Sequence, residues 1–77
     1  MAISRPDALK RLNGLAPRVE IHLNKIAGSP ASQDVPHWTG EINNWIRQME
    51  EVLPHVGKRT AADWAVRIAE WKARLGQ

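Results

Sequence analysis

Two stretches with the same apolar spacing decide the fold: "WTGEINNW" at residues 38–45 and "WAVRIAEW" at residues 64–71. Each reads Trp, three residues, Ile, two residues, Trp, and together they hold all four tryptophans of a chain without Phe or Tyr. Steps of four and three residues place these side chains on one face of an α-helix. The residues between the tryptophans differ completely, whereas a recognition motif would be expected to repeat some of them. The shared spacing therefore indicates helix packing rather than a repeated binding motif.

The first third of the chain has the same spacing without aromatic residues, which predicts a helix over residues 6–27. Ser4 is a suitable N-cap for it. Pro17 removes a backbone N–H and crowds the preceding turn, so we expect a kink near Asn13–Pro17, with Gly14 leaving room for the proline ring. Two helices broken at Gly14 remain the alternative. The apolar positions are Leu9, Leu12, Ala16, Val19, Leu23 and Ile26.

Two further helices follow a loop rich in Gly, Ser and Pro at residues 28–36. The apolar spacing around the first tryptophan stretch predicts a helix over residues 35–54, with Asp34 as its N-cap. The second stretch predicts a helix over residues 60–75, with Thr60 as its N-cap.

No segment alternates β-branched and polar residues as a strand would. Three amphipathic helices joined by short connections predict an all-α fold, a small antiparallel three-helix bundle that forms one domain over residues 1–77. The sustained heptad-like spacing leaves a second possibility open, in which an extended helical hairpin pairs with a second copy of the chain.

The formal net charge of +3 is unevenly distributed along the chain. Residues 1–29 carry five Lys or Arg and two acids, residues 30–57 carry one Arg and four acids, and residues 58–77 carry five Lys or Arg and two acids. Two interpretations follow. The basic and acidic segments attract each other inside the bundle, or a basic surface is available to an acidic partner.

The sequence contains no pattern typical of a catalytic or metal site. Its histidines are His22, His37 and His55, and no two of them are spaced three or four residues apart to form a helical metal pair. His37 could approach Asp34, and His55 could approach Glu51, but zinc needs three or four ligands. We expect no catalytic residues, no metal site and no cofactor, and therefore a protein that is not an enzyme.

A nucleic acid is the alternative partner, bound either through a helix-turn-helix over residues 47–71 with "VGKRT" as its turn, or through basic residues that follow phosphates. Basic residues recur every seven positions in the first and third predicted helices, and two more begin the third, so either row could follow phosphates. These candidate contacts with an anionic partner are Arg11, Arg18, Lys25, Lys58, Arg59, Arg67 and Arg74.

Binding to another protein, or to a second copy of this chain, is the function that the sequence favours. Four indoles are more than so small a core holds comfortably, and partly exposed Trp is enriched in binding hot spots. Trp38 is the indole we expect to stay exposed, with Ile21 and Val66 as further contacts outside the apolar seam. The chain has no cysteine, no apolar leader and no long apolar run, so we expect it in the cytoplasm and away from membranes.

Overall fold

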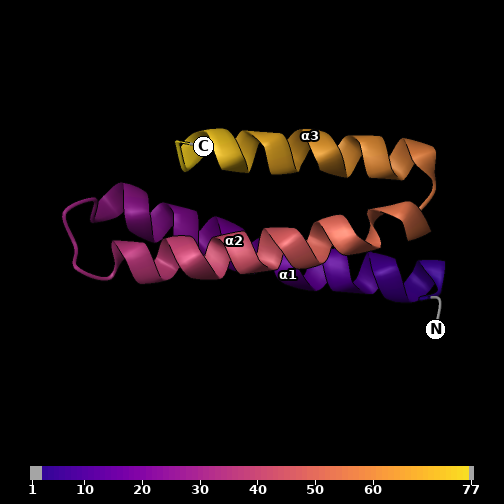
Figure 1. Ribbon diagram of the computed structural model, residues 1–77, viewed down its shortest axis with the longest axis horizontal. Coiled ribbons are helices and arrows are strands. Elements are labelled where there is room, and N and C mark those ends of the chain that lie inside the picture. The colour runs from indigo at the N-terminus through magenta and orange to yellow at the C-terminus, as the bar shows by residue number, and fades with distance from the viewer. Residues whose placement is uncertain (1–2, 77) are drawn as a thin grey trace.

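The computed structural model describes residues 3–76 as three α-helices and one short 3₁₀ turn (Figure 1). Helix α1 spans Arg5–Gly28, α2 spans Val35–Val52, η1 spans Leu53–His55 and α3 spans Lys58–Arg74. No strand occurs in this part of the chain. The predicted all-α three-helix fold is confirmed.

Helix α1 is one continuous helix that runs through Pro17. It begins as predicted, because the Ser4 hydroxyl accepts a hydrogen bond from the backbone N–H of Asp7 at 3.2 Å. The alternative of two helices broken at Gly14 is therefore wrong. A Cβ added at Gly14 would have no atom within 4 Å, so glycine is not required there to make room for the proline ring.

The junction between α2 and α3 differs from the prediction. The chain leaves α2 two residues earlier than expected and tightens into η1, and α3 begins at Lys58 rather than after Thr60. The N-cap of α3 is Gly57, whose φ of 86° is a conformation that glycine adopts readily and other residues rarely do. The carbonyl of Gly57 accepts the N–H of Ala61 at 2.9 Å, so Thr60 lies inside the helix and does not cap it.

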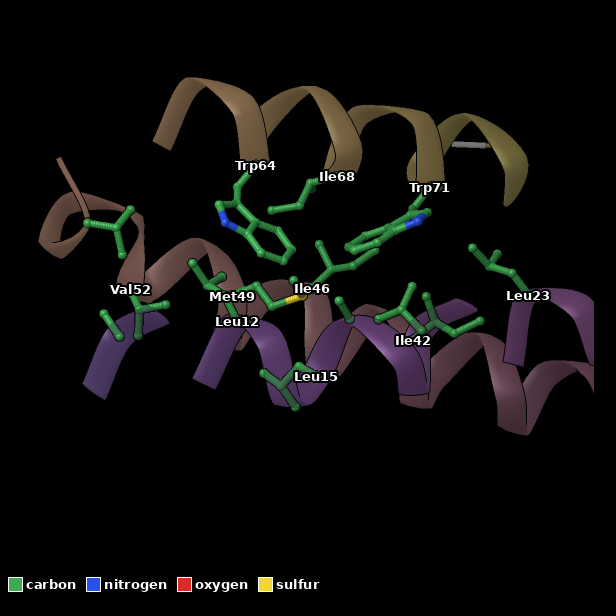
Figure 2. Close-up of a cluster of buried hydrophobic side chains, with 14 residues drawn as sticks. Leu12, Leu15, Leu23, Ile42, Ile46, Met49, Val52, Trp64, Ile68 and Trp71 are labelled. Atoms are coloured by element: carbon green, nitrogen blue, oxygen red, sulfur yellow. The ribbon is translucent and has the colours of Figure 1, made fainter. Parts of the chain in front are cut away.

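Helices α1 and α2 form an antiparallel hairpin, and α3 lies along one side of it (Figure 1). The side chains of Trp64, Ile68 and Trp71 point from α3 into the space above the hairpin (Figure 2). All three are buried, at 8%, 4% and 4% exposure. Along the long axis of the molecule, α3 ends before the loop that joins α1 and α2 (Figure 1).

The molecule is elongated, with extents of 40 × 21 × 16 Å. Its radius of gyration of 13.2 Å exceeds the roughly 11–12 Å expected for a compact chain of this length. The α1–α2 hairpin spans the long axis of the molecule, and α3 covers only one of the two sides of the hairpin (Figure 1). Leu15 points to the other side (Figure 2). The hairpin therefore presents a long flank that no other described element covers.

Candidate protein-binding surface

The contacts of the hairpin distinguish its two sides. Glu20 of α1 and Glu50 of α2 face α3, because each forms an ion pair with an α3 side chain at 3.2 Å. Successive helix residues are about 100° apart, so His22 lies about 160° around α1 from Glu20, and Glu41 about 180° around α2 from Glu50. His22 and Glu41 contact each other at 3.5 Å. They therefore meet on the side of the hairpin opposite α3.

The four tryptophans are divided between the core and this open side. Trp64 and Trp71 of α3 are buried, whereas Trp38 and Trp45 of α2 are partly exposed. Trp38 is the indole that the sequence analysis selected. Trp45 was missed, although its position seven residues after Trp38 places it on the same face of the helix.

Each partly exposed indole contacts a side chain from α1. The Nζ atom of Lys25 lies over the Trp38 ring, 5.9 Å from its centroid. The His22 ring meets the Trp45 ring edge-on, with centroids 4.7 Å apart and an interplanar angle of 86°. Trp45 also packs against the buried core. Trp45 is thus packed between the core and His22, whereas Trp38 has a cation–π contact at the upper end of the usual distance range.

Glu41 lies between the two indoles in the sequence of α2 and is shared by two histidines. Its carboxylate contacts the Nε2 of His37 at 2.6 Å and the Nε2 of His22 at 3.5 Å. His37 was predicted to approach Asp34, but its side chain contacts Glu41, four residues later. That spacing is a signal for a helical side-chain pair that could have been used. Within residues 3–76, no group of three such side chains could hold a metal ion.

Basic residues continue this surface along α1. Arg18, His22 and Lys25 follow one another at steps of four and three, so they share one helix face, and Arg11 extends the row by seven residues. Ile21, which is 54% exposed, lies at its edge, three residues after Arg18 and four before Lys25. We call the open side of the hairpin the indole face. It consists of Arg18, His22 and Lys25 of α1 and Trp38, Glu41 and Trp45 of α2.

Besides Lys25, two of the predicted basic contacts are engaged within the molecule. The guanidinium carbon of Arg67 lies 4.4 Å from the Trp64 ring centroid and 5.2 Å from that of Trp71. The same side chain donates a hydrogen bond to Glu20 at 3.2 Å. Arg74 donates to the side-chain oxygen of Asn24 at 3.3 Å. Both arginines therefore fasten α3 to α1.

The remaining predicted residues lie apart from the indole face. Val66 is 60% exposed and lies about 160° around α3 from the buried Ile68, so it points away from the hairpin. Lys58 and Arg59 are exposed in the first turn of α3, which contains no acidic residue. The structure thus brings Trp38 and Lys25 into contact, places Arg18 on the same face of α1 as Lys25, and leaves Val66 on another surface.

The comparisons with known proteins give no further identification. No protein-family model, no curated protein and no solved structure matches this chain. The surface of residues 3–76 contains no detected pocket. No helix in this range is both long enough and apolar enough to cross a membrane.

Proposed function

We propose that this protein is a non-enzymatic binding module that recognises another protein through the indole face. The observation that supports this most strongly is the pair of partly exposed indoles, Trp38 and Trp45, each held by a side chain from the neighbouring helix. Tryptophan and arginine are the residues most enriched in binding hot spots. The absence of cysteine fits a reducing compartment, and we place this function in the cytoplasm.

Pre-ordering of the indoles favours binding. Immobilising a flexible side chain at an interface costs about 0.5–1.5 kcal/mol. Lys25 and His22 contact the two rings within the chain itself. We expect these contacts to lower the cost of ordering the rings when a partner binds.

A nucleic acid is the second candidate, because Arg11, Arg18 and Lys25 form a row beside the indoles. Proteins that bind single-stranded nucleic acid stack its bases on open aromatic rings. One face of the Trp38 ring is covered by Lys25, and the Trp45 ring is met by His22. Stacking of a base needs an open ring face, whereas apolar side chains also pack against the edge of a partly covered ring, and for this reason we favour a protein partner.

Site-specific photo-crosslinking tests the proposal. A photoreactive residue is introduced in the source cells at Asn44, an exposed position next to Trp45, or at Glu70, an exposed position on α3. We expect discrete protein adducts from position 44 that position 70 does not give. The substitution W38A, combined with the crosslinker at position 44, should reduce them. Identical adducts from the two positions, or adducts that persist in the W38A variant, would refute the proposed surface.

A further inference from the structure

The charge of the indole face indicates the chemistry of its partner. Arg18 and Lys25 are basic residues, and Arg11 extends their row. The only carboxylate of the face, Glu41, is already shared between two imidazoles. The face is therefore positive beside its indoles, and no ion pair of residues 3–76 involves the side chains of Arg11, Arg18 or Lys25.

The spacing of these groups indicates the shape of the partner. The two indoles are seven residues apart on α2, and Arg18 and Lys25 are seven apart on α1, so each pair spans about 10.5 Å along its helix. Lys25 lies over the Trp38 ring, and His22 contacts the Trp45 ring. Arg18 is one helical turn before His22. The cations and the indoles thus form two parallel lines of equal repeat. An α-helix with apolar residues on one face and acidic residues on its flank has the same repeat.

We propose that the indole face binds an acidic amphipathic α-helix of another protein, laid along the hairpin on the side opposite α3. The apolar face of this helix contacts Trp38 and Trp45, and its acidic flank faces Arg18 and Lys25. This inference rests on the proposed function and specifies the partner. A second copy of the chain fits less well, because two indole faces would bring their cation rows into the same interface.

Two synthetic peptides of about three heptads test the charge requirement. Both have leucine at the apolar heptad positions, and they differ only in having glutamate or lysine on the flanks. Binding to the full chain is followed by fluorescence anisotropy of the labelled peptide. Measurements at about 0.15 M and about 1 M salt compare screening lengths of about 8 Å and about 3 Å.

The R18E variant reverses a charge on the indole face, and R59E reverses one on the exposed first turn of α3 as a matched control. We expect the glutamate peptide to bind and the lysine peptide not to bind. R18E should weaken the affinity for the glutamate peptide about tenfold or more, and R59E should change it less than about twofold. Circular dichroism melts confirm that both variants are folded.

Several results would overturn the inference. They are equal binding of the two peptides, equal effects of R18E and R59E, and absence of binding by the glutamate peptide. A dimer in sedimentation that the peptide dissociates would identify a second copy as the occupant. Direct binding of labelled oligothymidylate at low salt, lost in R18E and kept in R59E, would identify a nucleic acid as the occupant. Adducts at position 44 without peptide binding would reject the acidic helix alone and leave the protein-binding function standing.

Discussion

Replacement of Trp71 by alanine is expected to remove most of the attachment of α3 to the hairpin. Trp71 is only 4% exposed and points from α3 toward α1 and α2 (Figure 2). It is one of three buried side chains by which α3 reaches the hairpin, together with Trp64 and Ile68. It also provides one of the two rings under the guanidinium of Arg67.

The size of the effect follows from this burial. A buried tryptophan removes about 150–250 Å² from water, which corresponds to about 4–6 kcal/mol at 25 cal/mol per Å². Substitutions of buried tryptophan by alanine typically cost about 3–5 kcal/mol. A domain of 77 residues is expected to have a total stability of about 4–12 kcal/mol. The W71A variant should therefore lose a quarter or more of its unfolding free energy, or fail to fold.

Urea denaturation followed by circular dichroism measures this loss. The W38A variant is the matched control, because it makes the same substitution at an indole that is partly exposed. We expect W38A to cost about 1 kcal/mol, the typical value for a single substitution. A loss below about 1.5 kcal/mol for W71A, or equal losses for both variants, would refute the assigned packing of α3.

Three further pairs of measurements use the same denaturation assay. G57A should destabilise the protein by about 1 kcal/mol, because the φ of 86° at Gly57 strains any residue other than glycine. G14A should stabilise it by up to about 1 kcal/mol, because Gly14 lies in a helix interior and an added Cβ meets no neighbour there. Effects of the same sign for the two variants would contradict this account. S4A should cost about 1 kcal/mol as the loss of an N-cap, and T60A less than about 0.5 kcal/mol, so a larger effect of T60A would show that the α3 cap is misassigned. R67A should cost about 1–2 kcal/mol of unfolding free energy at both low and high salt, because the contacts of Arg67 with the two indole rings contribute more than its exposed ion pair with Glu20. If the destabilisation disappears at high salt, the ion pair is the larger contribution.

The apolar spacing was sufficient to predict three helices, because burial of one face determines which segments become helical. It was less informative about the helix ends. The start of α3 depends on the backbone conformation of Gly57, which lies outside the repeating pattern. The role assigned to Gly14 was wrong for a similar reason, since the space around a residue depends on neighbours that the periodicity does not locate.

The site was predictable only in part. Trp38 and Trp45 occupy equivalent seam positions, as do Trp64 and Trp71, so the spacing alone cannot tell which pair is buried. That depends on which side of the hairpin α3 covers. Likewise, the contact between Arg67 and Glu20 joins residues 47 positions apart, and no local pattern marks it. The basic rows looked alike in the sequence, but Arg67 and Arg74 contact α1 across the molecular surface, while Arg18 and Lys25 lie on the open side.

The most direct test of the indole face follows the four indole N–H signals by NMR while the glutamate peptide is added to the ¹⁵N-labelled protein. We expect the signals of Trp38 and Trp45 to shift together along one saturating curve. The signals of Trp64 and Trp71 should stay in place, because these rings are buried beneath α3. Shifts confined to Trp64 and Trp71, or no shift in any of the four signals, would contradict the account.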